Sequence, residues 1–335
     1  MQHVTSENLN EKSILITGAT GSFGQAFVSE CIKQFTPSKV IVFSRDELKQ
    51  HEMSQIYAGQ NHECMRYFLG DVRDESRLEM AMRGVDIVIH AAALKQVPAA
   101  EYNPFECICT NVHGAENIVR AATRVGVPKV LALSTDKAAN PINLYGASKL
   151  AADKIFVAAN NISGGRSRFS VVRYGNVIGS RGSVIPFYKK LILEKAKALP
   201  VTDKRMTRFW ITVKQGVEFV LSSLKMMQGG EIFVPKIPSM KITELASALA
   251  PELPQEEIGI RPGEKLHETM ITTDDARNTL ELDDRYIIRQ QFYAPEPNFD
   301  GITNIKTLPD GFHYSSDSNS HWLSRKEMLD LILAE

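Results

Sequence analysis

Residues 13–24 read Ser-Ile-Leu-Ile-Thr-Gly-Ala-Thr-Gly-Ser-Phe-Gly, and this stretch decides the fold. An apolar run meets glycines spaced Gly-x-x-Gly-x-x-Gly, and an amphipathic segment follows to about Lys33. Glycines let a backbone approach a pyrophosphate, and a helix N-terminus adds free N–H groups. A structural turn is the alternative, but a strand before and a helix after the glycines favour a dinucleotide site. The residues expected to hold the dinucleotide here are Gly18, Thr20, Gly21, Ser22, Phe23 and Gly24.

The rest of the first half repeats this alternation of β-branched runs with amphipathic segments. Strands are predicted at residues 13–17, 40–43, 67–69, 86–90, 129–134 and 170–173. Helices are predicted at 22–33, after 46, and at 75–82, 105–125 and 145–160. Near-continuous apolar strands that alternate with helices indicate a parallel sheet covered on both faces. The predicted fold class is α/β, a Rossmann-type doubly wound parallel sheet with a smaller C-terminal substrate domain.

The second half has a looser rhythm. Helices are predicted at 184–197 and 215–226, a strand at 231–234, and a long loop at 298–319. Ser324 and Glu327 form a capping-box pattern ahead of a final apolar helix. We therefore expect a dinucleotide-binding domain at 1–180, to which segments at about 208–236 return. Residues 181–335 are expected to form mainly the substrate domain and a C-terminal tail.

Composition excludes several classes of function. The 335 residues include 39 Lys plus Arg and 39 Asp plus Glu, so the net charge predicts no nucleic-acid or membrane-surface partner. The four cysteines lack zinc-ligand spacing, so no metal site is expected. The first residues carry no signal-peptide core, and no apolar run approaches the roughly 18 residues that span a bilayer. We expect a cytoplasmic protein.

The end of the second strand indicates which dinucleotide is bound. An NAD site prefers an acidic residue there, whereas this chain has Arg45, with Lys49 one helical turn further on. Because a guanidinium suits a 2′-phosphate, NADP is favoured, and a solvated charged loop is the alternative. Asp71 could accept from an adenine amino group or could equally cap a helix. The residues expected at this end are Ser44, Arg45, Asp46, Lys49, Asp71 and Val72.

A second motif carries the chemistry. Tyr145 and Lys149 lie four residues apart, on one face of a predicted helix. A free tyrosine has a pKa of about 10, and a nearby ammonium favours its phenolate. Such a phenolate can take a hydroxyl proton while hydride leaves the same carbon for the cofactor. The pair follows the fifth strand and the hydroxyls of Ser134 and Thr135, which is the order that a short-chain dehydrogenase requires.

These motifs resemble the extended short-chain dehydrogenases/reductases. A narrower match is similar to the inverting UDP-N-acetylglucosamine 4,6-dehydratases of pseudaminic acid synthesis. It is carried by Leu-Ser-Thr-Asp-Lys-Ala-Ala-Asn-Pro-Ile-Asn-Leu-Tyr-Gly-Ala-Ser-Lys at 133–149 and by Val-Arg-Tyr-Gly-Asn-Val at 172–177. It continues in Gly-Ser-Arg-Gly-Ser at 179–183, Met-Thr-Arg-Phe-Trp at 206–210 and Arg-Pro-Gly-Glu-Lys at 261–265. The resemblance runs from about residue 12 to 290, and the tail motif at 314–322 fits it as well.

The resemblance implies a reaction. Tyr145 and NADP would oxidise carbon 4 of the sugar, the ketone would acidify the proton on carbon 5, and water would be lost from carbon 6. Asp136 and Lys137, directly after Thr135, fit the acid and base that this requires, and the lysine would exchange the proton at carbon 5. A lysine acts as a base only where burial or positive charge lowers its pKa. Which of the two takes or gives each proton stays open, and a surface ion pair is the alternative.

The resemblance also implies further site residues. Lys95 could instead be a surface lysine whose ammonium reaches solvent, and the charged residues of the second half could instead form interdomain salt bridges. Additional cofactor contacts are expected from Ala91, Ala92, Ala93, Lys95, Tyr145, Lys149 and Val177. Substrate contacts are expected from Lys95, Lys137, Asn176, Arg181, Thr202, Met206, Arg208, Arg261 and Glu264, with Arg205 in the same region.

Several rival functions remain open from the sequence. A nucleotide-sugar 4-epimerase would use the same Tyr145 and Lys149 but needs no acid/base pair at 136 and 137. Retaining dehydratases carry an Asp-Glu pair there, and related inverting enzymes begin the route to N-acetyl-fucosamine-type sugars. From another class, a non-catalytic NADP-binding regulator or scaffold has no reason to keep these side chains together. The resemblance implies a homo-oligomer, dimer or hexamer, with UDP-N-acetylglucosamine as substrate.

Overall fold

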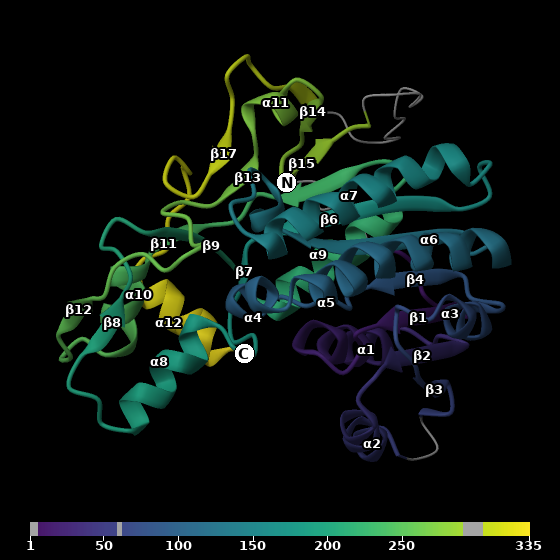
Figure 1. Cartoon of the computed structure of the whole chain (residues 1–335), viewed down its shortest axis with the longest axis horizontal. Coiled ribbons are helices and arrows are strands. Elements are labelled where there is room, and N and C mark those ends of the chain that lie inside the picture. The colour runs from purple at the N-terminus through teal and green to yellow at the C-terminus, as the bar shows by residue number, and fades with distance from the viewer. Residues whose placement is uncertain (1–5, 59–61, 291–303) are drawn as a thin grey trace.

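The computed structural model describes residues 6–58, 62–290 and 304–335. Within these residues a main sheet of ten strands runs in the order β16-β14-β15-β10-β6-β5-β4-β1-β2-β3 (Figure 1). Its parallel strands, from β3 to β10, pair in register along runs of buried apolar residues. They are β1 (Ser13–Thr17), β2 (Lys39–Ser44), β3 (Met65–Leu69), β4 (Ile87–His90), β5 (Lys129–Thr135), β6 (Arg168–Tyr174) and β10 (Ile232–Pro235). The predicted doubly wound parallel sheet is confirmed.

Helices cover both faces of this sheet. On one face α3, α6 and α7 pack against one another, and on the other α1 packs against α9, as right-handed crossovers require. The strand order reverses between β1 and β4, so a crevice opens at the carboxyl ends of these strands. The helices are α1 (Ser22–Gln34), α2 (Glu47–Ile56), α3 (Glu75–Met82), α6 (Gly114–Val125), α7 (Leu144–Ile162) and α9 (Val213–Met226).

A smaller hydrophobic cluster lies at the carboxyl end of the main sheet, and we call it the small lobe (Figure 1). It includes a three-stranded sheet in the order β11-β9-β7 and the pair β8 and β12. The strands are β7 (Asn176–Val177), β8 (Leu199–Val201), β9 (Thr207–Ile211), β11 (Ser239–Lys241) and β12 (Gln255–Glu257). The helices are α8 (Val184–Leu193), α10 (Ile242–Leu249) and α12 (Arg325–Leu333).

The chain crosses between the two parts more often than a division near residue 180 supposes. Within 208–236, α9 and β10 lie on or in the main sheet, whereas β9 pairs in the small-lobe sheet while its Phe209 and Ile211 side chains belong to the main core. Three antiparallel strands also extend the main sheet: β14 (Thr279–Glu281), β15 (Arg285–Ile288) and β16 (Lys306–Thr307). A second strand pair, β13 (Thr269–Ile271) with β17 (Tyr314–Ser315), and the short helix α11 (Thr273–Ala276) complete this region.

Several predicted boundaries differ. The helix expected at 105–125 is α5 (Pro104–Ile108), a π-helical turn at Cys109–His113, and then α6; α4 (Val97–Tyr102) precedes it without having been predicted. The helix expected at 184–197 ends at Leu193, because Lys195 has a φ of 56°, outside the helical region. The first part of the loop expected at 298–319 lies outside the described residues, and the rest contains β16 and β17.

Helix caps follow the sequence closely. The predicted capping box is present, with the Glu327 N–H donating to Ser324 Oγ at 3.2 Å and the Ser324 N–H donating to the Glu327 carboxylate at 2.8 Å. Such reciprocal bonds satisfy the unpaired N–H groups of a helix start. No helix in the described ranges has both the length and the apolar character needed to cross a membrane.

Candidate active site

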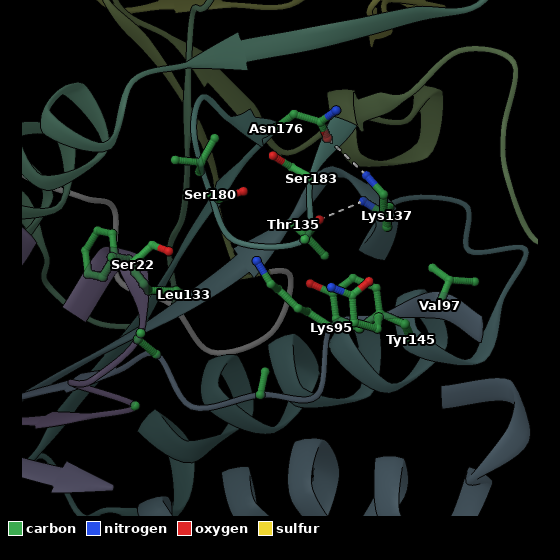
Figure 2. Close-up of a pocket in the computed structure, with 18 of the residues that line it drawn as sticks. Ser22, Lys95, Val97, Leu133, Thr135, Lys137, Tyr145, Asn176, Ser180 and Ser183 are labelled. Carbon is green, nitrogen blue, oxygen red and sulfur yellow. Dashed lines mark hydrogen bonds between the residues drawn. The ribbon is translucent and has the colours of Figure 1, made fainter. Parts of the chain in front are cut away.

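A cavity of about 1120 Å³ extends from the glycine loop after β1, past the ends of β4, β5 and β6, into the small lobe. Figure 2 shows part of it, with Lys95, Lys137 and Tyr145 around the same space and Ser22 and Ser180 further along. Of the site residues expected from the sequence, all except Asp136, Arg181 and Arg205 lie on its wall.

The glycine loop is built for close approach. Gly18 has a φ of 65°, and a Cβ at this position would lie 2.8 Å from the backbone nitrogen of Ala92. Helix α1 follows with Gly21 as its N-cap, without a side-chain cap and without an acidic residue in its first turn. Its first N–H groups and its positive dipole end therefore face the cavity unopposed, which suits a pyrophosphate.

The end of β2 carries the cationic groups expected to select the dinucleotide. Asp46 caps α2 by accepting from the Lys49 N–H at 3.0 Å and also pairs with the Lys49 ammonium, and these bonds with Lys49 lower its pKa. Its carboxylate is thereby engaged, while Arg45 is half-exposed and touches Asp71 at 3.4 Å. Asp71 does not cap a helix, because Asp74 caps α3.

The hydroxyls at the end of β5 have different partners. Ser134 Oγ donates to Asp153 Oδ2 at 2.8 Å, and Asp153 pairs with Arg173 at 3.2 Å, so Ser134 belongs to a buried structural network. Thr135 Oγ1 instead donates to Asp136 Oδ1 at 3.0 Å and accepts from the Lys137 N–H. Thr135 is therefore the hydroxyl tied to the charged turn at Asp136–Ala138.

Helix α7 brings Tyr145 and Lys149 to this turn. Its N-cap Asn143 accepts from the Gly146 N–H at 2.7 Å, and Gly146 packs so closely that a Cβ would lie 2.2 Å from the Lys137 carbonyl oxygen. Lys149 is buried and its ammonium donates to the Leu133 carbonyl at 2.6 Å. The first turn of α7 and the turn carrying Lys137 thus form one rigid unit.

An ammonium favours the Tyr145 phenolate, as expected, but in the protein alone burial has the larger effect. Burial raises the pKa of Tyr145 to about 12, which outweighs the lowering influence of the Lys137 ammonium and of a hydrogen bond with Thr135. Burial also lowers the pKa of Lys149. A phenol in this position needs a further positive charge in the cavity before it ionises near neutral pH.

In the protein alone Lys137 does not meet the condition for a lysine base, which is a lowered pKa. Burial alone would lower it, but the carboxylates of Asp136 and Glu268 raise the Lys137 pKa above its ordinary value. The ammonium lies 3.0 Å from Asp136 Oδ1 and 3.2 Å from Glu268 Oε1, and it donates to Asn176 Oδ1 at 3.3 Å (Figure 2 draws the last bond). In the protein alone Lys137 is therefore charged.

Asp136 does not reach the cavity directly. Its side chain is 0% exposed, one oxygen serves Thr135 and Lys137, and the other has no hydrogen-bond partner. Burial raises its pKa, with the charge of Glu268 adding to the effect and that of Lys137 opposing it. Any proton that Asp136 exchanges with a bound molecule must pass through Lys137 or Thr135.

Arg181 lies away from the expected substrate contacts. Its backbone N–H donates to Ser22 Oγ at 3.4 Å, and its charge helps to lower the pKa of Asp46 after the larger effect of Lys49. Both neighbours belong to the dinucleotide end of the cavity. These contacts place Arg181 nearer the expected cofactor contacts than the expected substrate contacts, and its role with the sugar stays a prediction.

The small-lobe end of the cavity contains Thr202, Met206, Arg208, Arg261 and Glu264. Arg208 donates to the backbone carbonyls of residues 207, 265 and 266, so its guanidinium is fixed. Arg261 is half-exposed and lies 3.7 Å from Glu264, which leaves it able to meet an anionic ligand. Arg205, also considered from the sequence, turns to Asp203 at 2.7 Å instead.

Two charged residues near Lys137 were missed from the sequence. Glu268 is 2% exposed, and Lys265 lies 3.7 Å from it. Lys265 is the last residue of the motif at 261–265, and Glu268 follows it by three residues. Lys95 lines the cavity near Tyr145, and desolvation lowers its pKa (Figure 2). Among the described residues no group of His, Cys, Asp and Glu has the arrangement of a metal site.

Fold and site together define an extended short-chain dehydrogenase/reductase. The chain belongs to the polysaccharide biosynthesis protein family, which matches residues 14–290. It is 59% identical over 329 residues to the inverting UDP-N-acetylglucosamine 4,6-dehydratase of Campylobacter jejuni subsp. jejuni serotype O:23/36 (strain 81-176), with 96% of this chain and 98% of the relative covered. The predicted resemblance to that family is confirmed.

Two further matches bear on the fold and on the rival function. A protein of Rickettsia typhi (strain ATCC VR-144 / Wilmington) named UDP-glucose 4-epimerase is 40% identical, with 96% of each chain covered. The X-ray structure of Pen from Bacillus thuringiensis has a TM-score of 0.88 at 35% identity and covers 97% of this chain and 98% of its own. The fold therefore extends over nearly the whole chain.

Proposed function

We propose that the chain is an NADP-dependent UDP-N-acetylglucosamine 4,6-dehydratase, a hydro-lyase that inverts carbon 5. The product would be UDP-2-acetamido-2,6-dideoxy-beta-L-arabino-hex-4-ulose. One observation carries the proposal: Lys137 and Tyr145 line the same cavity, and Lys137 is held beside two buried carboxylates. The 59% identity to a relative of this name supports it.

The cofactor would be held by the chain's own dinucleotide end. The glycine loop and the uncapped start of α1 fit a pyrophosphate, and Arg45 with Lys49 supports NADP over NAD because a guanidinium pairs well with a 2′-phosphate. When bound, the nicotinamide would accept a hydride from carbon 4 of the sugar and would later supply it to carbon 6. Val177, Lys149 and the alanines at 91–93 would line its nicotinamide half.

Tyr145 would remove the proton of the sugar 4-hydroxyl. Its raised pKa means that it is protonated in the protein alone, and added positive charge in the cavity is needed to bring its pKa down. Thr135, bonded to the same turn, would orient that hydroxyl. This makes proton removal at carbon 4 conditional on a loaded site.

Lys137 would exchange the proton on carbon 5 once a ketone at carbon 4 has acidified it. Its ammonium shares a 3.0 Å hydrogen bond with Asp136, whose pKa is raised by burial, so one proton can move between them. Transfer to Asp136 leaves a neutral amine, which takes the carbon 5 proton and is an ammonium again; the proton left on Asp136 would then pass through Lys137 or Thr135 to the departing 6-hydroxyl, which leaves as water. We therefore assign Asp136 the role of a proton store behind Lys137.

The substrate's diphosphate would meet Arg261 and its sugar would meet Asn176 and Lys95. Arg261 is half-exposed on the cavity wall at the small-lobe end, and Asn176 already accepts from Lys137. By resemblance, we also infer that the chain acts in the cytoplasm as a homodimer or hexamer and that its product enters pseudaminic acid synthesis. Size-exclusion chromatography with light scattering tests the oligomeric state, where a monomer would contradict it.

The test of function is incubation with UDP-N-acetylglucosamine in deuterated water, followed by NMR. A 4-keto-6-deoxy product with inverted, deuterated carbon 5 supports the proposal. A 4-epimer with an intact 6-hydroxyl would identify an epimerase, and a retained configuration at carbon 5 would identify a retaining dehydratase. Tight NADP binding without turnover of any UDP-hexosamine would identify a regulator.

A further inference from the structure

Glu268 is a buried carboxylate with no role in the reaction described so far. It precedes β13, 131 positions after Lys137 in the sequence, yet its Oε1 lies 3.2 Å from the Lys137 ammonium. Lys265 lies 3.7 Å from its Oε2, and the Arg208 guanidinium lies 3.9 Å from its Oε1. Glu268 is thus a carboxylate that all three of these cations share.

The contacts of Lys137 use the full capacity of an ammonium. A lysine ammonium has three N–H donors. Lys137 Nζ has three acceptors within reach, on Asp136 at 3.0 Å, Glu268 at 3.2 Å and Asn176 at 3.3 Å. A neutral amine would keep two donors and would leave one of these buried oxygens without a proton, which is unfavourable for a desolvated carboxylate. The triple contact therefore fixes both the charge and the direction of the side chain.

The backbone of Glu268 is anchored as firmly as its side chain. Its N–H donates to Ser316 Oγ at 2.9 Å, and its carbonyl accepts from the Ser316 N–H at 2.8 Å. Ser316 Oγ in turn lies 2.7 Å from Thr207 Oγ1 on β9, next to Arg208. Thr207 of β9 and Ser316, which follows β17, therefore fix the backbone position from which the Glu268 carboxylate reaches Lys137.

We propose that Glu268 is a positioning residue that holds the Lys137 amine at the cavity wall and keeps it protonated between proton transfers. The inference rests on the proposed dehydratase function, which gives Lys137 a proton to exchange. Glu268 itself touches no reacting atom and acts through Lys137. Glu268 and Asp136 place two negative charges beside Lys137. The pKa of Glu268 is lowered although its burial acts to raise it, and the Lys137 ammonium is the largest cause of the lowering, which fits this role.

Removing the charge of Glu268 should weaken the hold on the Lys137 proton. The remaining cations would repel the ammonium, and only Asp136 would oppose them. The apparent pKa of Lys137, and the limb of the pH–rate profile that it controls, should then move to lower pH. The charged and titratable groups facing Lys137 from the packed elements are Asp136, Tyr145, Arg208, Lys265 and Glu268.

The experiment compares wild type with Glu268→Gln and Glu268→Asp, and uses Glu231→Gln as the matched control. Glu231 is a buried carboxylate that accepts from Ser170 Oγ at 2.6 Å, and it does not line the cavity. The first readout is kcat and KM for UDP-N-acetylglucosamine across pH. The second is the rate at which an amine-acylating reagent labels Lys137 without substrate, measured by mass spectrometry against exposed Lys189 in the same sample.

Glu268→Gln should move the pH–rate limb down by about one unit, with KM changed less than twofold, and should raise Lys137 labelling at about pH 8 roughly tenfold. Glu268→Asp keeps the charge and should recover most of both values. Glu231→Gln should leave both at wild-type level. If Glu268→Gln does not fold, labelling of wild-type Lys137 across pH still decides, because an apparent pKa at or below that of Lys189 overturns the proposal.

The proposal would also be overturned if folded Glu268→Gln had the same pH–rate profile and the same Lys137 labelling rate as the wild type. The labelling readout needs no turnover. If the wild-type protein dehydrates no UDP-sugar in the NMR assay, the proposed function is refuted. If Glu268 does not hold the Lys137 proton, the labelling rates show it even without turnover.

Discussion

Lys137→Met removes the ammonium from between two buried carboxylates and keeps a side chain of similar length. Asp136 is 0% exposed and Glu268 is 2% exposed, so neither is well placed to recruit bulk water in its place. Breaking a buried ion pair by removing one partner costs about 3–5 kcal/mol, and we take about 3 kcal/mol because Lys137 is itself 24% exposed. For a chain of 335 residues this corresponds to a fall in Tm of about 4 °C.

The instability of Lys137→Met should depend on pH with a definite sign. Asp136 already has a pKa raised above 3.8 in the folded protein, and loss of the neighbouring ammonium raises it further. A carboxyl whose pKa rises on folding costs stability as pH increases from its unfolded pKa toward its folded one. The Tm difference from wild type should therefore shrink as pH is lowered toward about 4.

Differential scanning fluorimetry across pH measures this stability, and the NMR assay measures turnover on the same samples. We expect dehydration to fall by about 10²–10⁴-fold, the usual contribution of a positioned acid or base. The double variant Asp136→Asn/Lys137→Met should regain much of the Tm but none of the activity, because it removes the charge of Asp136, which Lys137 had paired, without restoring a proton carrier. Near-wild-type turnover in Lys137→Met, or a Tm deficit that grows in acid, would refute the reasoning.

Three other variants test separate parts of the site. Tyr145→Phe should retain NADP binding, measured by nicotinamide fluorescence, and lose about 10²–10⁴-fold in kcat; a loss under tenfold would contradict its role at the 4-hydroxyl. Arg45→Ala should lower the preference for NADP over NAD by about tenfold in competitive binding, and an unchanged ratio would remove the argument for NADP. Arg181→Ala should weaken NADP binding more than it raises the sugar KM; the reverse would return Arg181 to the substrate.

Local sequence signals predicted the first half of the fold well. The glycine loop, the start of α1 and helix α3 depend on short-range glycine geometry and apolar periodicity, and these are visible in the sequence. The same holds for the caps, since Ser324 and Glu327 are only three residues apart. The π-helical turn at Cys109–His113 was missed because Asn111 there bonds to Leu94 and Ser148, which are distant in sequence.

Long-range pairing explains most of what the sequence did not reveal. Strands β14–β16 are short and extend the main sheet by pairing with one another and with β10, which no local pattern indicates. Glu268 reaches Lys137 only through the fold. The sequence could not show whether the Lys137 pKa is lowered, as a base requires, because the second carboxylate that raises it is distant in sequence.

Charge and burial also had to be weighed together. The sequence placed Tyr145 and Lys149 on one helix face correctly, and both line the cavity. It could not show that burial would dominate the Tyr145 pKa, or that Lys149 would donate to the Leu133 carbonyl. Spacing predicts which groups share a face, whereas the protonation of each group depends on the packed surroundings.

Following a label on carbon 5 of the sugar tests the central claim most directly. UDP-N-acetylglucosamine carrying deuterium at carbon 5 is converted in ordinary water, and the product is analysed by NMR and mass spectrometry. We predict a 4-keto-6-deoxy sugar with the opposite configuration at carbon 5 and with hydrogen in place of the deuterium, and no such product from Lys137→Met. Recovery of sugar that still carries its deuterium in the original configuration, after turnover by the wild-type protein, would contradict the role given to Lys137.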